Sequence, residues 1–182
     1  MKRFFTFCCT LPLLALLTGF FRSTPTWEEV NATIDRQYPT IASIDVDTLK
    51  ALLDAGQPPV LIDVRGKDEF AASQLPQASN ISTASEVAYA KDTPIVVYCS
   101  VGIRSAAFAK ALQEKGFTDV RNLRGSIFLW ANRGYPLQRG EQRVRAVHPY
   151  DKNWGILLNP ELHKYQPGTE ELIVPGNRGV SQ

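Results

Sequence analysis

The chain has 182 residues, of which 44% are hydrophobic and 21% charged, and a formal net charge of +2. These fractions are typical of a globular protein and exclude a disordered chain. The length allows one ordinary domain with short extensions, and its core needs no disulfide. Because the net charge comes from Lys2 and Arg3, the remainder is near neutral, and we expect no nucleic-acid partner.

The first residues differ from the rest of the chain. Residues 4–21 carry no charge, are rich in Leu and Phe, and directly follow Lys2 and Arg3. This pattern predicts a signal peptide or an N-terminal membrane anchor over residues 1–21. We therefore expect an exported protein, periplasmic or anchored to the inner membrane facing the periplasm, which contacts the membrane only through this segment.

Strands and helices are expected to alternate along the chain. A capping box of Thr26 and Glu29 begins the first helix. The expected elements are, in order, a helix at 24–38, a strand at 41–44, a helix from Asp47 to 55, a strand at 60–64, a helical turn at 67–72, a strand at 80–81, a helix at 83–90, a strand at 95–98, a helix at 103–115, a strand at 119–123, a short helix at 126–132 and an exit turn at 134–137.

The pattern predicts an α/β fold, a single domain with a mostly parallel central sheet flanked by helices on both faces. The continuous apolar runs at 60–64 and 95–98 are typical of parallel strands buried on both faces. We place a helical extension at 22–40, the domain at 41–142, and a tail at 143–182.

The tail is expected to be partly packed, with a disordered end at 167–182. It has little periodicity, and its expected packing residues are Tyr150, Trp154 and residues 156–158. His148 and His163 show no ligand spacing, so we expect no metal site.

The charge is unevenly spread along the chain. Residues 22–98 carry six basic and eleven acidic side chains, whereas residues 99–145 carry nine basic and three acidic ones. A basic region favours a small anionic substrate. Solvated arginines explain the same pattern, and for Arg124 and Arg133 both interpretations stay open.

The most informative segment is the Cys99 loop, residues 99–105, directly after the second buried strand. Ligands of open α/β sheets bind at the carboxyl ends of strands, where Cys99 is placed. The following helix start offers free N–H groups, and Gly102 allows loop amides to turn inward. Such a loop binds anions and stabilises a thiolate, and Arg104 adds a guanidinium suited to an oxyanion.

We interpret Cys99 as a catalytic nucleophile in this loop. With Cys8 and Cys9 in the leader, it is the one thiol left outside that segment, and such a thiol is either incidental or reactive. A small buried hydrophobic side chain is the alternative. The expected substrate-binding residues are Ser100, Val101, Gly102, Ile103, Arg104 and Ser105.

Three pieces of this sequence together resemble the rhodanese family of sulfurtransferases. They are Cys99–Ser105, Leu61–Arg65, and Leu123–Ser126 with Trp130, Gly134 and Pro136. The resemblance spans about residues 44–140. It implies a single rhodanese-like domain that transfers a sulfane sulfur from thiosulfate or a similar donor to a thiophilic acceptor, cyanide or a thiol, through a Cys99 persulfide. It implies no metal or organic cofactor.

The chain departs from the family pattern in two places. Residues 73–78 read Ser-Gln-Leu-Pro-Gln-Ala, without the histidine and glycines usual there, which we interpret as a changed surface turn. The side chains of Ser100, Val101 and Ile103 are small or apolar, where members efficient with thiosulfate often carry charge. This second departure leaves the sulfur donor open.

Asp63 and Arg65 end the first buried strand and are expected to support the site. We expect Asp63 to fix the loop geometry and Arg65 to form an ion pair, with Glu69 as the candidate partner. A direct catalytic role for either residue is the less favoured interpretation.

Two other functions compete with the enzyme interpretation. Cysteine-dependent phosphatases of related fold have a longer loop, sized for phosphate, whereas only four residues separate Cys99 from Arg104. The second is a persulfide carrier for a sulfur-accepting protein, or a non-enzymatic rhodanese-like binding module.

Overall fold

The computed structural model describes residues 24–165, so the leader and the expected disordered end lie outside the described residues. The elements are α1 (Trp27–Gln37), β1 (Ala42–Ile44), α2 (Val46–Asp54), β2 (Val60–Asp63), α3 (Lys67–Ala72), β3 (Ser79–Asn80), η1 (Ala84–Glu86), β4 (Ile95–Tyr98), α4 (Ile103–Glu114), β5 (Val120–Leu123), α5 (Ser126–Asn132), β6 (Leu137–Arg139), β7 (Gln142–Val144), η2 (Gly155–Leu157) and η3 (Pro160–Leu162). No helix in this range has the length and apolar character needed to span a bilayer.

A five-stranded sheet in the order β1-β5-β4-β2-β3 forms the centre of the described molecule, and each of its pairings is parallel. The central strand β4 aligns Val96 with Leu61 of β2 and with Arg121 of β5. The predicted α/β fold with a parallel sheet is confirmed.

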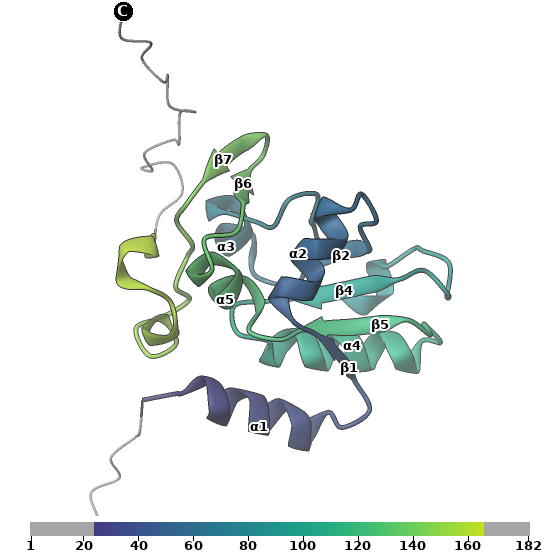
Figure 1. Ribbon diagram of the computed structural model, residues 1–182. Coiled ribbons are helices and arrows are strands. Elements are labelled where there is room, and N and C mark those ends of the chain that lie inside the picture. The colour runs from purple at the N-terminus through teal and green to yellow at the C-terminus, as the bar shows by residue number, and fades with distance from the viewer. Residues whose placement is uncertain (1–23, 166–182) are drawn as a thin grey trace, which may run out of the picture.

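Helices cover both faces of this sheet. Figure 1 shows α1 and α4 on one side and α2 and α5 on the other. Successive side chains of β4 alternate between the faces, as the pleat requires, so Val96 and Tyr98 join one apolar cluster while Ile95 and Val97 join the other. All four are buried, which explains why this strand appears in the sequence as a continuous apolar run.

Three local predictions differ from the structure. The cap of α2 is Asp45, which accepts a hydrogen bond from the Thr48 amide at 2.7 Å, rather than Asp47. Over residues 83–90, where a helix was expected, the structure has only the 3₁₀ turn η1. Val87 is the single buried residue of this range, and one buried side chain cannot hold two helical turns against the domain. The exit turn after α5 leads into an antiparallel hairpin of β6 and β7 that was not predicted.

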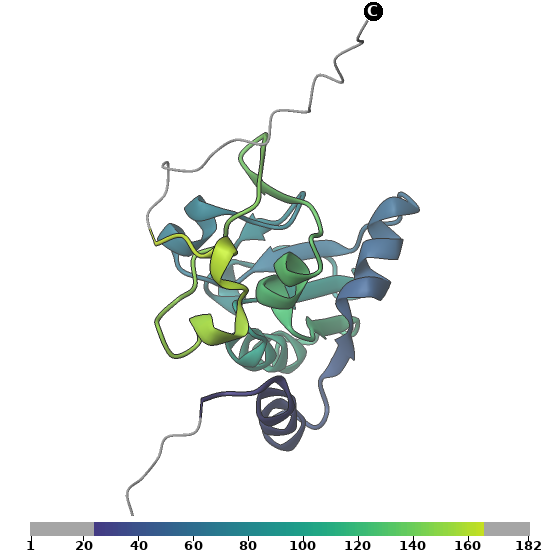
Figure 2. The same cartoon turned by 60° about the vertical axis from the view of Figure 1, so that its left-hand side comes forward.

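The C-terminal segment, residues 145–165, packs on the domain. Leu157, Leu158 and Leu162 enter the core, whereas Ile156 is 55% exposed and was wrongly expected to pack. The side-chain nitrogen of Asn132 donates to the Leu157 carbonyl at 2.8 Å, and this bond ties the segment to α5. In Figures 1 and 2 the segment, in yellow-green, lies beside α5 at the end of the sheet where β4 and β5 finish.

Candidate active site

Cys99 lies at the carboxyl end of β4, where its sulfur accepts a hydrogen bond from the loop. The Gly102 amide donates to the Cys99 Sγ at 3.1 Å. Gly102 has φ +111° and ψ −10°, a backbone region that strongly favours glycine. A Cβ at this position would lie 3.1 Å from Ile34 Cδ1, so glycine satisfies both the conformation and the close packing of α1.

Three carbonyls of the Cys99 loop are hydrogen bonded to α5 and β5. Two amides in the first turn of α5 donate to the carbonyls of Cys99 at 3.2 Å and Ser100 at 3.1 Å. The Asn122 side chain donates to the Gly102 carbonyl at 3.0 Å. Because the N–H of a trans peptide points opposite to its carbonyl, the N–H groups of these peptides point away from α5 and β5.

Ser105 and Asn122 hold the sulfur side of the loop. The Ser105 hydroxyl lies 2.7 Å from Asn122 Oδ1, 3.2 Å from the Gly102 carbonyl and 3.6 Å from the Cys99 Sγ. A hydroxyl has one proton, so Asn122, at the shortest distance, is its acceptor in this arrangement. Sequence reasoning missed Asn122, because β5 reads Val-Arg-Asn-Leu and nothing local in the sequence distinguishes its buried asparagine from its partly buried arginine.

The Arg104 guanidinium is already paired with a carboxylate. It donates to both carboxylate oxygens of Glu69 at 2.8 and 2.9 Å, and to the Ser100 hydroxyl at 2.9 Å. Burial by itself would raise the pKa of Glu69, but the hydrogen bonds and charge of Arg104 hold that pKa below its usual value. The guanidinium that the sequence predicted to suit an oxyanion thus lies against a carboxylate, and the charges of this ion pair cancel overall.

Asp63 and Arg65 form a separate buried pair behind the site. Arg65 Nη2 lies 2.7 Å from Asp63 Oδ2, and the Arg65 amide donates to Asp63 Oδ1 at 2.9 Å. The expected pairing of Arg65 with Glu69 is wrong, since the turn after β2 folds the Arg65 side chain back onto Asp63. Arg65 also donates to the Ser73 carbonyl.

This pair lies beside Cys99 but does not line its cavity. Asp63 aligns with Tyr98, the residue before the cysteine. Gly66 follows Arg65 in the chain, and its amide donates to the Glu69 carboxylate at 2.9 Å. The buried pair therefore fixes the turn from which Glu69 reaches Arg104.

A cavity of about 110 Å³ opens beside the sulfur. Its lining is Cys99, Ser100, Val101, Ile103, Arg104, Tyr150 and Trp154. The last two come from the C-terminal segment, and the Arg104 guanidinium carbon lies 4.7 Å from the centre of the Tyr150 ring. Sequence reasoning treated these aromatic residues as anchors of the tail, with a partner-binding role as the alternative, because nothing local links them to a loop so distant in sequence.

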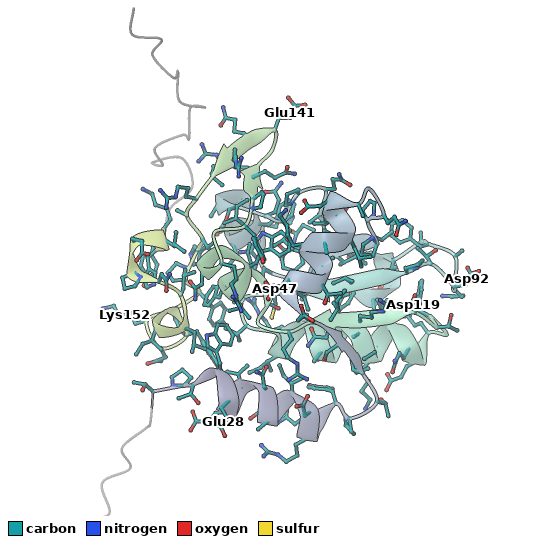
Figure 3. The ribbon with its side chains drawn as sticks, in the orientation of Figure 1. Glu28, Asp47, Asp92, Asp119, Glu141 and Lys152 are labelled. Carbon is teal, nitrogen blue, oxygen red and sulfur yellow. The ribbon has the colours of Figure 1, made fainter. Side chains whose placement is uncertain are left out.

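The loop that carries these aromatic residues lies at the carboxyl end of the strands. Figure 3 shows Lys152, which is exposed on this loop, at the opposite end of the molecule from Asp92, which precedes β4. The direction of β4 therefore leads from Asp92 toward the C-terminal segment.

The two arginines that could attract anions, Arg124 and Arg133, are engaged in ion pairs. Arg124 pairs with Asp35 at 2.7 Å and Arg133 with Asp47 at 3.6 Å, and neither lines the cavity. A larger cavity of about 500 Å³ lies where α5 ends, against β7 and η3, but its lining contains no cysteine, serine or histidine. Among residues 24–165, no three His, Cys, Asp or Glu side chains are grouped as metal ligands would be.

A parallel strand that ends in a thiol, followed by a glycine turn and a helix start, defines a class of α/β domains built around a cysteine. Residues 45–133 match the model of the rhodanese-like domain. A sulfurtransferase of Allochromatium vinosum is 32% identical over 103 residues, which cover 53% of this chain and 94% of that protein.

Two further comparisons agree. The thiosulfate sulfurtransferase GlpE of Coxiella burnetii is 35% identical over 75 residues, covering 39% of this chain and 70% of that protein. The crystal structure of a thiosulfate sulfurtransferase from Pseudomonas aeruginosa matches with a TM-score of 0.53 at 25% identity, covering 60% of this chain and 22% of that one. This chain belongs to the rhodanese-like sulfurtransferase family.

Proposed function

We propose that this protein moves a sulfane sulfur from thiosulfate or a similar donor to cyanide or a thiol through a persulfide on Cys99. The observation that carries the proposal is the Gly102 amide 3.1 Å from the Cys99 Sγ, in a loop that opens on a cavity of about 110 Å³. The relatives named as sulfurtransferases support the reaction class.

In the first step the Cys99 thiolate attacks the outer sulfur of the donor. A sulfur–sulfur bond forms to Cys99, and the bond between the outer sulfur and the sulfonyl sulfur breaks. Sulfite leaves with the electron pair when the donor is thiosulfate, and the protein retains a persulfide anion. Peptide N–H groups of the Cys99 loop stabilise that anion, as oxyanion-hole donors stabilise an oxygen.

In the second step a thiophilic acceptor attacks the terminal sulfur of the persulfide. Cyanide takes this sulfur to become thiocyanate, and the sulfur–sulfur bond electrons return to Cys99 as a thiolate. The scheme is covalent, ping-pong catalysis. The transferred sulfur or the donor is bound by the residues of the Cys99 loop, which are Ser100, Val101, Gly102, Ile103, Arg104 and Ser105. Asp63 and Arg65 keep the strand end in place.

Intact-mass spectrometry after treatment with thiosulfate tests the loading step. We expect the protein to gain the mass of one sulfur atom, and Cys99→Ser to gain none. Equal masses before and after treatment, with thiosulfate and with an organic donor of the same sulfur, contradict the proposal.

The Arg104–Glu69 pair weighs against phosphatase activity. A phosphate monoester needs cationic or N–H donors around three oxygens, and the one arginine lining the cavity already binds a carboxylate. We expect no release of phosphate from p-nitrophenyl phosphate under conditions that load Cys99.

We also propose that the protein acts outside the cytoplasm, from the charge-free residues 4–21 after Lys2 and Arg3. The N-terminal residue of the protein recovered from cell fractions tests this. A start after residue 21, or full-length protein in the membrane fraction, is expected. Full-length protein in the cytoplasmic fraction contradicts it.

A further inference from the structure

Two aromatic side chains from the C-terminal segment form a wall of the cavity at Cys99. Tyr150 and Trp154 line it together with the loop residues Val101 and Ile103. Both lie beyond residues 45–133, the part that matches the family model. This wall is therefore a feature of this chain's own C-terminal segment.

Hydrogen bonds hold the wall in a defined shape. The Asp151 carboxylate accepts the amides of Asn153 at 2.8 Å and Trp154 at 2.9 Å. The Tyr150 amide donates to His148 Nδ1 at 3.1 Å. Tyr150 itself has φ +65°, an uncommon conformation for a tyrosine, which the surrounding bonds maintain.

The lining of this cavity supplies no unpaired positive charge. Arg104 is its one basic residue, and Glu69 binds that guanidinium through both carboxylate oxygens. A dianion such as thiosulfate would lose hydration on entry and find no free cation in return. A donor with one charge and an apolar group would lose less hydration on entry, and its apolar group would contact Val101, Ile103 and Trp154.

We infer that Tyr150 and Trp154 determine donor specificity, favouring a singly charged sulfur donor with an apolar substituent over dianionic thiosulfate. The inference rests on the proposed function, since it names the substrate class of the same site. Tyr150 also contacts the Arg104 guanidinium, so the wall is fixed to the one basic side chain that lines the cavity.

Organic thiosulfonates are the matched probes for this inference. In benzenethiosulfonate a phenyl group replaces one oxygen of thiosulfate, so that the anion carries one charge and the same outer sulfur. Attack by the Cys99 thiolate forms the same persulfide, breaks the bond between the outer sulfur and the sulfonyl sulfur, and releases benzenesulfinate with the electron pair. Methanethiosulfonate has the same charge with a smaller apolar group.

The experiment measures the second-order rate constant for loading Cys99 with each donor, by intact mass at short times. Each constant is divided by that donor's rate constant with free cysteine, which removes intrinsic reactivity. After this correction we expect a roughly tenfold preference for benzenethiosulfonate over thiosulfate, the discrimination that one apolar group achieves in a hydrophobic pocket.

Two variants and two controls assign the preference to the wall. Tyr150→Ala and Trp154→Ala should each reduce the corrected preference at least about fivefold, within the range of one apolar contact. Ile156→Ala, in the same segment but exposed, and Tyr89→Ala, an exposed tyrosine outside it, should leave the preference unchanged. Trp154→Phe keeps an apolar ring and should retain most of the preference, which separates the wall's role from misfolding.

The outcomes separate the two proposals. If no donor loads Cys99, the proposed function is wrong and the inference falls with it. If all donors load Cys99 but the corrected preference is absent, or persists in both alanine variants, the inference is wrong while the sulfurtransferase proposal stands.

Discussion

Asn122 is the residue that connects the two ends of the Cys99 loop. Its amide nitrogen donates to the Gly102 carbonyl at 3.0 Å, and its oxygen lies 2.7 Å from the Ser105 hydroxyl. The side chain is fully buried, so neither bond can be replaced by water without rearrangement.

Asn122→Ala should therefore weaken both the fold and the site. It leaves a buried carbonyl and a buried hydroxyl without their partner, a loss of about 1–3 kcal/mol in the free energy of unfolding. Urea denaturation measures it, with the exposed Asn159→Ala expected to stay within about 0.5 kcal/mol of the native protein. Equal stability of both variants would show that Asn122 does not hold the loop.

Glu69 gives the site a pH dependence. Because its pKa is lowered in the folded protein, the ionised pair with Arg104 stabilises the fold above the unfolded-state pKa of about 4.3. That stabilisation is lost as the pH falls through the folded-state pKa, where Glu69 becomes protonated.

Glu69→Gln removes this titration. The difference in unfolding free energy between the native protein and the variant should be largest near neutral pH and should shrink as the medium is made more acidic than the unfolded-state pKa of about 4.3. Urea denaturation at a series of pH values measures it. If the difference in unfolding free energy grew on acidification, folding would raise the pKa of Glu69 instead of lowering it.

At the scale of elements, two glycines with positive φ flank α4, one just before it and one just after its C-cap, but they have different surroundings. Gly102 at its start is enclosed, because a Cβ there would lie 3.1 Å from Ile34 Cδ1, whereas a Cβ on Gly116 at its end would meet nothing within 4 Å. Gly102 also directs its amide to Cys99, so only the first glycine joins the helix to the site.

Alanine at the two positions separates conformation from packing. Gly116→Ala should cost about 1 kcal/mol for the backbone conformation alone, and Gly102→Ala about 1–3 kcal/mol, because its φ of +111° is less accessible to alanine and Ile34 must also shift. Chemical denaturation compares them. Sulfur loading should fall only in Gly102→Ala, and comparable losses in both variants would contradict the special role of this turn.

The elements that the sequence predicted well are those with a strong local signal. The apolar runs of β2 and β4 and the helical spacing of α4 each need only neighbouring residues to be recognised. The β6–β7 hairpin has three-residue strands, too short for alternation to be visible.

The same distinction applies to the site. The Cys99 loop could be predicted because its residues are consecutive. The Arg104–Glu69 pair spans 35 positions of sequence, and the Asn122–Gly102 bond spans 20, so only the folded sheet brings these partners together. Tyr150 and Trp154 are more distant still, in a segment without periodicity.

At the scale of the whole molecule, the C-terminal segment is part of the core and part of the site. Leu158 is 1% exposed and packs in the same cluster as Trp130 of α5. The burial of Leu158, which follows Trp154 closely in the chain, therefore holds the aromatic wall in place at Cys99.

Leu158→Ala should loosen the segment. We expect a loss of about 2–5 kcal/mol in the free energy of unfolding, as for other buried leucines, and a smaller donor preference because the wall is no longer held. Ile156→Ala, in the same turn but exposed, is the control. Full donor preference in a destabilised Leu158→Ala protein would show that the wall stands independently of the core.

The proposed function depends on Cys99 carrying sulfur covalently between two substrates. The direct test is a single-turnover chase, in which donor-treated protein is freed of small molecules, mixed with cyanide, and assayed for thiocyanate and for the mass of the protein. We predict one thiocyanate for each persulfide lost, return of the protein to its original mass, and no thiocyanate from Cys99→Ser. Thiocyanate formed equally by the serine variant, or a sulfur adduct that cyanide does not remove, would contradict the proposed function.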